Sequence, residues 1–92
     1  MTVEDGVVDV LDEPRGRFVV RFGSGSCSVF ELLRQPGQQA ASVRLAVGDT
    51  VRAAPDGIGK LVMLNMTRKL PLLVNGLTGA IDHAHCLRAM AD

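Results

Sequence analysis

The sequence predicts a small, mostly antiparallel β-barrel of five or six strands, followed by a C-terminal helix. Val-rich segments alternate with Gly, Pro and Asp turn residues from about residue 6 to about residue 75. The apolar period then changes to three residues over about residues 79–91. A length of 92 residues suits one domain. Aromatic residues make up only 3% of the chain, so aliphatic residues and Met must build most of the core.

Three strands are expected in the first third of the chain. The segment GVVDVLDE suits the first strand, and the Pro and Gly that follow it turn the chain. In RFVVRF, residues 17–22, the two phenylalanines and Val20 should face a core, and the two arginines and Val19 should face mostly solvent. A Gly/Ser turn over residues 23–26 leads to the third strand, CSVFELL.

The middle of the chain is expected to form a loop and two more strands. RQPGQQAAS is polar and predicts a loop, with a short helical turn near Gln38–Ala41. A Gly-Asp turn precedes a strand at Thr50–Ala54, and a PDG turn leads to a fifth strand at Lys60–Met66. Because this fifth strand is almost continuously apolar, we expect it to be covered on both faces.

The last third of the chain is expected to add a sixth strand and the helix. Leu70–Val74 suits a strand, and Pro71 favours an edge position because proline cannot donate to a ladder. Thr78 precedes the helical segment and Asp82 lies near its first turn, as is typical of a capped helix. The apolar positions of the helix recur every three residues: Ile81, Ala84, Leu87 and Met90.

The charges are unevenly distributed although the formal net charge is zero. Residues 1–13 contain five acids and no base, whereas residues 14–69 contain nine bases and three acids, a balance of +6. This asymmetry permits an anionic partner for the middle of the chain. The alternative is that the acidic start folds back on the basic middle.

Two cysteines and the absence of a signal pattern bear on the compartment. The N-terminus is acidic and lacks a basic segment followed by an apolar one, and no apolar run approaches the roughly 20 residues that span a bilayer. We therefore expect a cytoplasmic protein with reduced Cys27 and Cys86 and no membrane contact.

Five segments follow one another over about residues 6–67: GVVDV, RGRFVVRF, CSVFEL, LAVGDTVRA and GKLVMLNMT. In order and spacing they resemble the cold-shock and oligonucleotide/oligosaccharide-binding (OB) barrel family. The resemblance implies binding of single-stranded RNA or DNA on the outer faces of the second and third strands, where aromatic rings stack on bases. An SH3-like barrel is the structural alternative.

Eight residues are candidates for weak, sequence-tolerant and salt-dependent nucleic-acid binding. The arginines suit phosphates, and Phe30 is the one phenylalanine that remains a candidate stacking platform. In the alternative interpretation, Phe30 is a core residue, and the arginines of residues 17–22 form an ordinary solvated strand face, paired with Glu31. The eight candidates are Arg15, Arg17, Arg21, Phe30, Arg52, Lys60, Arg68 and Lys69.

A protein-interaction or self-association module is the alternative function. Residues 70–77 contain four leucines. If this leucine-rich segment is an uncovered edge, it would pair with a protein partner or form a homodimer. In the other interpretation, the C-terminal helix covers the segment.

The motif DHAHC, residues 82–86, is the only cluster of metal-ligand types. On a helix its two histidines would point about 200° apart, and only Asp82 has a helical partner at the right spacing, in His85 or Cys86. Nothing in the spacing shows that a histidine approaches Cys27, and GSGS lacks the lysine of a phosphate-binding loop. We therefore expect no enzyme activity, no metal and no cofactor.

Overall fold

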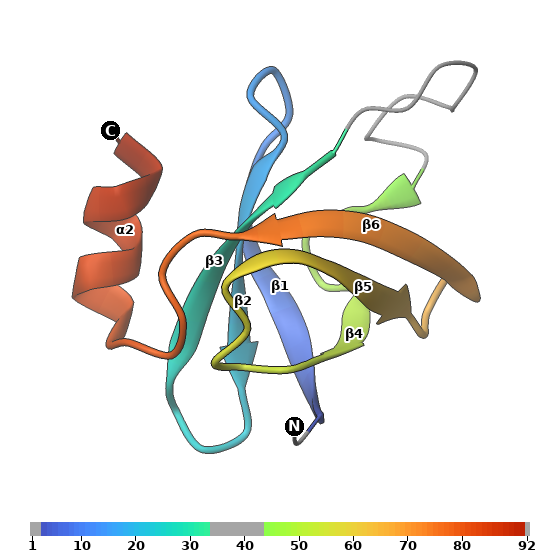
Figure 1. The fold of residues 1–92 in the computed structure, drawn as a ribbon, viewed down its shortest axis with the longest axis horizontal. Coiled ribbons are helices and arrows are strands. Elements are labelled where there is room, and N and C mark those ends of the chain that lie inside the picture. Colours follow the sequence, from blue (N-terminus) through green and yellow to red (C-terminus); the bar gives the residue numbers. More distant parts are fainter. Residues whose placement is uncertain (1–2, 34–43, 92) are drawn as a thin grey trace.

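The computed structural model describes residues 3–33 and 44–91, and it shows a closed antiparallel barrel with one helix beside it (Figure 1). The strands follow the order β1-β2-β3-β6-β5-β4 around the barrel, so β4 returns beside β1 and completes a Greek key. This confirms the predicted fold class. The elements are β1 (Glu4–Asp12), β2 (Arg17–Phe22), β3 (Cys27–Leu32), β4 (Thr50–Ala53), β5 (Gly59–Asn65), β6 (Leu70–Gly76) and α2 (His83–Ala91). The helical turn expected near Gln38–Ala41 lies outside the described residues.

The barrel core is built from the inward-facing side chains of all six strands. In β2, Phe18, Val20 and Phe22 face this core, as the alternation predicts. Phe18 and Phe30 pack with their ring centroids 5.8 Å apart. Phe30 is therefore a core residue on β3 and is fully buried, which rules out its use as a stacking platform.

The barrel closes where β6 meets both β3 and β5. Gly76 is paired with Phe30 on one side and with Gly59 on the other. A Cβ atom at Gly76 would lie only 2.0 Å from the carbonyl oxygen of Gly57, so the loop before β5 crosses directly above it. Only glycine leaves room for this close approach.

The helix α2 begins at His83, later than expected. Asp82 is the residue before it and accepts a hydrogen bond from the His85 amide at 2.8 Å, which caps the first turn. Thr78 instead accepts a hydrogen bond from the Val29 amide, and Ile81 forms a bridge with β3. Within residues 3–33 and 44–91, no helix is long and apolar enough to cross a membrane.

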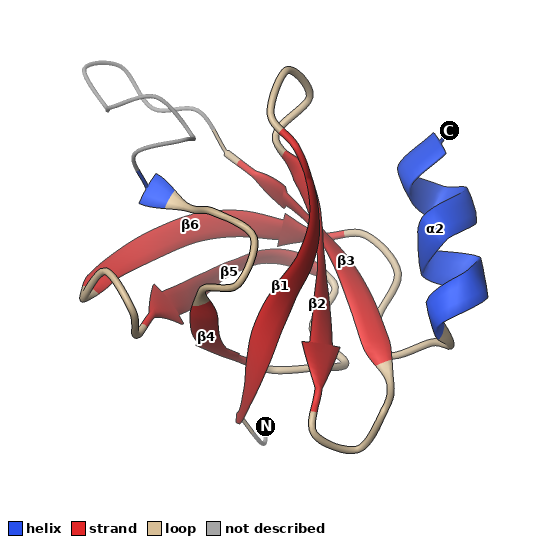
Figure 2. Cartoon of the chain, turned by 180° about the vertical axis from the view of Figure 1, so that it is seen from behind, coloured by secondary structure: helices blue, strands red, loops and turns tan. Residues whose placement is uncertain are grey.

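The helix packs on the outer faces of β2 and β3, on the opposite side of the barrel from β4 and β5 (Figures 1 and 2). Of the predicted three-residue apolar stripe, Ile81 and Met90 pack against the strands, but Ala84 and Leu87 are exposed, and Cys86 faces the strands instead. Val19 points outward, as expected, but α2 covers it completely. The expectation that Val19 faces solvent is therefore also wrong.

Two expectations for β5 and β6 need correction. β5 is not covered on both faces, because Val62 is 62% exposed and Leu64 is 44% exposed. β6 is not an edge strand, because it lies between β3 and β5 in the closed barrel. Pro71 fits there because it stands opposite Leu64 on β5, outside the part of β6 that pairs with β3.

Candidate functional site

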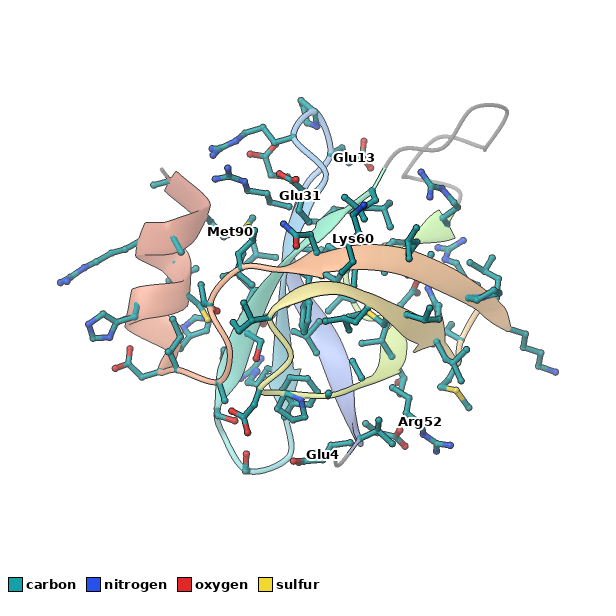
Figure 3. All side chains as sticks on the ribbon, viewed as in Figure 1. Glu4, Glu13, Glu31, Arg52, Lys60 and Met90 are labelled. Atoms are coloured by element: carbon teal, nitrogen blue, oxygen red, sulfur yellow. The ribbon has the colours of Figure 1, made fainter. Side chains whose placement is uncertain are left out.

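The basic residues expected to bind nucleic acid divide into two groups on the barrel. One group lies on or beside β2, next to α2: Arg15, Arg17 and Arg21. The other belongs to β4, β5 and the turn after β5: Arg52, Lys60, Arg68 and Lys69. Figure 3 shows Lys60 and Arg52 on their strands, and Met90 on the side of α2 that faces the barrel. The two groups have different surroundings, and these determine what each side of the barrel can bind.

The three arginines beside α2 are all engaged with other groups of the chain. Arg21 contacts Asp9 at 2.8 Å, and Arg17 contacts Glu31 across the hairpin at 3.5 Å. Arg15 contacts Asp12 at 3.8 Å and donates a hydrogen bond to the carbonyl oxygen of Met90 at 2.9 Å. The acidic start of the chain thus folds back on the basic strand, and much of the local positive charge is neutralised.

Asp9 joins β1 to both β2 and α2. It lies where the β1–β2 register shifts between Val8 and Val10, and its two carboxylate oxygens contact Arg21 at 2.8 Å and His83 Nε2 at 2.7 Å. The hydrogen bond with His83 lowers the pKa of Asp9, partial burial opposes this, and the charge of Arg21 adds to it. Asp9 therefore helps to hold α2 against the barrel.

The interface beneath α2 is a second apolar cluster, separate from the barrel core. It contains Val19, Cys27, Val29, Cys86 and Met90. Burial raises the pKa of the Cys86 thiol to about 12, with the neighbouring Cys27 adding to the effect, and burial also raises the pKa of Cys27. Both thiols are thus protonated at neutral pH, which makes them packing groups and poor nucleophiles.

The outer side of β5 and β6 carries an apolar surface that we call the β5 face. Its members are the outward-facing apolar residues of the two strands and of the turn between them: Val62, Leu64, Met66, Pro71 and Leu73. Val62 is paired with Leu73, and Leu64 with Pro71, so these side chains lie next to one another. Met66, just past Leu64, is 40% exposed. No described element covers this face, since α2 packs elsewhere.

The border of the β5 face is mainly basic. Lys60 stands at one end, opposite Asn75, and Lys69 belongs to the turn at the other end. Among the described residues, neither lysine forms an ion pair. Arg52 lies beside Leu64 and contacts Asp5 at 2.7 Å, so one carboxylate also borders the face.

A polar network fixes the basic turn at the end of the face. Asp49 accepts hydrogen bonds from Arg68 at 2.7 Å, from Asn65 at 2.9 Å and from the Ala46 amide at 3.0 Å. Burial by itself would raise the pKa of Asp49, but these hydrogen bonds together lower it. Asn65 was not among the predicted site residues, although a lone amide within an apolar strand is a recognisable signal of a buried polar contact.

The DHAHC segment is occupied by local contacts. His85 Nδ1 lies 2.7 Å from Asp82, His83 contacts Asp9, and Cys86 faces the barrel. Within the described ranges, no three His, Cys, Asp or Glu side chains are placed to hold a metal ion. Among the described residues, the β5 face is therefore the best-defined candidate site. No family model, curated protein or solved structure matches this chain.

Proposed function

We propose that this chain is a non-enzymatic protein-interaction module that binds its partner through the β5 face. The observation that carries the proposal is the exposure of three successive outward residues of one strand and its turn: Val62, Leu64 and Met66. Single exposed apolar residues are ordinary on protein surfaces. A contiguous group with a polar border is typical of an interaction site.

The leucine-rich segment contributes to this surface through its outward-facing residues. Leu72 and Val74 face the barrel core, whereas Pro71 and Leu73 face outward beside β5. Because β6 has a neighbour on each side, the binding mode that fits is side-chain docking on a sheet face. Strand addition, which needs an open row of backbone groups, fits this segment poorly.

The polar chemistry of the chain also supports a binding role. Both histidines contact carboxylates, and burial raises the pKa of both thiols, so the common nucleophiles and bases serve structural contacts. We further propose a cytoplasmic location, in which the adjacent thiols of Cys27 and Cys86 stay reduced.

Site-specific photo-crosslinking tests the proposal in the cells that make this protein. A benzophenone amino acid replaces Val62 on the β5 face in one variant and Leu87 on α2 in the control. We expect adducts with a defined protein from position 62 only, and their loss when Leu64→Asp is added. Val62 and Leu87 are 62% and 43% exposed, so the probe is accessible to solvent at both positions. Equal adducts from both positions, or none from position 62, would refute the function.

Single-stranded RNA or DNA binding, with an OB- or cold-shock-like use of the barrel, is our second candidate function. Its support is that Arg52, Lys60, Arg68 and Lys69 all border the open β5 face. The loss of Phe30 as a stacking residue weakens it, because base stacking contributes roughly 1–3 kcal/mol per base.

An amide-shift titration with a short single-stranded RNA and DNA, at low and physiological salt, tests this second function. Shifts at Lys60 and Lys69 that salt reverses would support it. The absence of shifts at low salt would exclude it. Lys60→Glu combined with Lys69→Glu is the matching variant, and Arg88→Glu on α2 is its control.

A further inference from the structure

We infer that the segment bound at the β5 face is an amphipathic helix of a protein partner whose apolar stripe is flanked by acidic residues. This inference rests on the proposed protein-binding function, which it makes specific. It draws on three properties of the structure: how the barrel already holds α2, the length of the face, and the charge at its two ends.

The barrel itself shows that its outer face can hold a helix. Val19, Val29 and Cys27 present an apolar surface on β2 and β3, and α2 covers it with Cys86 and Met90. The remaining sides of α2 are exposed to solvent. The β5 face offers a comparable pair of strands with five apolar side chains, so it provides enough surface for another amphipathic helix.

The length of the face matches a helix of ordinary size. Six residue steps separate Lys60 from Met66, which corresponds to roughly 20 Å at about 3.3 Å per residue. A helix rises about 1.5 Å per residue, so about 13 residues span the same distance. A helix of about four turns would place its ends near the two basic borders.

Charge indicates the chemistry of that helix. The bases without an ion pair among the described residues are Lys60, at one end of the face, and Lys69, in the turn at the other end, where Arg68 precedes it. Arg68 is held there by Asp49. Carboxylates near the two ends of a bound helix would complement these bases, and complementary charges favour the correct partner and speed its association.

The same charges argue against a second copy of this chain as the occupant. In a face-to-face dimer with parallel strands, Lys60 would meet Lys60 of the second copy. With antiparallel strands, Lys60 would meet the end that carries Lys69. Both arrangements bring bases against bases, which is unfavourable at an interface.

Fluorescence anisotropy with a synthetic helical peptide tests the inference on the full chain. The probe has 14 residues, leucines at helical spacing along one side, and two glutamates near each end; a second probe carries lysines in place of the glutamates. We expect the acidic probe to bind and Leu64→Asp to weaken it at least tenfold. Leu87→Asp should change its affinity less than twofold.

A charge exchange provides the specific readout. Lys60→Glu together with Lys69→Glu should reverse the preference between the acidic and the basic probe, whereas Arg88→Glu on α2 should leave it unchanged. Circular dichroism of each variant verifies that the barrel is retained. Failure of the acidic probe while crosslinking from position 62 still yields a protein would overturn the helix inference and leave the proposed function intact. Detection by sedimentation of a dimer that Leu64→Asp disrupts would identify a second copy of the chain as the occupant. Binding of single-stranded RNA instead of either peptide would identify nucleic acid as the occupant. Each of these outcomes would also overturn the helix inference.

Discussion

The two outer faces of this barrel both carry outward-facing apolar residues, but these residues are buried on one face and exposed on the other. On β2 and β3, Val19 and Val29 point outward and are completely buried by α2. On β5, Val62 points outward and is 62% exposed. The difference comes from the helix, which covers one face and leaves the other open. An outward-facing valine on a strand therefore indicates an exposed surface only where no helix packs over it.

The charges of the two faces differ in the same way. Beside α2, acids of the first strand and of β3 contact the arginines, so this part of the chain supplies its own counterions. At the β5 face, Lys60 stands opposite the neutral Asn75. The covered face thus has both its apolar and its ionic contacts satisfied within the chain. At the β5 face Arg52 and Arg68 also contact carboxylates, whereas Lys60 and Lys69 form no ion pair among the described residues.

The largest difference between the two faces is expected when an aspartate replaces an outward valine, because the loss of unfolding free energy depends on whether the new charge is buried. Val19→Asp places a carboxylate beneath α2 without a designed partner, and we expect the free energy of unfolding to fall by about 3–5 kcal/mol. Val62→Asp places the same carboxylate in solvent and should change it by less than about 0.5 kcal/mol. Urea unfolding of both variants measures the difference. Equal losses would show that the two faces are equally covered in solution.

The next largest difference in the free energy of unfolding is expected when one methionine on each face is replaced by alanine. Met90 is buried between α2 and the barrel, so Met90→Ala should lower the free energy of unfolding by about 2–3 kcal/mol. Met66→Ala, on the open face, should cost less than about 1 kcal/mol.

Thiol labelling shows whether the loss from Met90→Ala is local to α2. With its pKa near 12, Cys86 carries roughly a thousandfold less thiolate at pH 8 than a thiol of pKa about 8.5. We expect slow alkylation of the native protein and of Met66→Ala, and faster alkylation of Met90→Ala. Rapid alkylation of the native protein would mean that α2 does not protect the thiols.

The barrel was predictable because its signals are local. Alternating apolar residues, Gly-rich turns and β-branched segments mark the strands, and β2 has the predicted bounds of Arg17–Phe22. Closing the barrel requires contacts between segments that are distant in the sequence, such as β3 with β6, and the periodicity of the sequence does not specify these contacts. For that reason Pro71 suggested an edge strand, although the strand has neighbours on both sides.

The candidate site was only partly predictable. The bases and the leucine-rich segment that contribute to the β5 face were identified, but their surroundings depend on where α2 packs. The three-residue period selected Met90 correctly but also selected Leu87, whereas Cys86, four residues before Met90, faces the barrel. The predicted binding strand lies beneath this helix, and the strand expected to be covered on both faces is the open one. Sequence periodicity predicted the helix but gave no information on which face it covers.

The network at the end of the β5 face should make stability depend on acid pH. Asp49→Asn removes the charge that Arg68 and Asn65 contact, and we expect a loss of about 1–2 kcal/mol at pH 7. Folding lowers the pKa of Asp49, so the ionised form stabilises the fold above about pH 4, the ordinary carboxylate range, and this stability is lost as pH falls through the lowered pKa. Urea unfolding between pH 7 and pH 3 should show a shallower decline for Asp49→Asn than for the native protein. Parallel curves would exclude Asp49 as the source.

The contact between Asp9 and His83 should have the smallest effect, because it is solvent-exposed. His83→Ala should lower the free energy of unfolding by about 0.5 kcal/mol, as is usual for surface pairs. The hydrogen bond with His83 is the main cause of the lowered pKa of Asp9, so the variant should move that pKa back toward its ordinary value. An NMR titration of the Asp9 carboxyl carbon measures this shift, and His85→Ala, whose contact with Asp82 lies within the helix end, is the control. An unchanged Asp9 titration in His83→Ala would leave the apolar contacts of Cys86 and Met90 as the main attachment of α2 to the barrel. By comparison, apolar side chains alone would then be sufficient for the β5 face to hold a helix, without a counterpart of the Asp9–His83 contact.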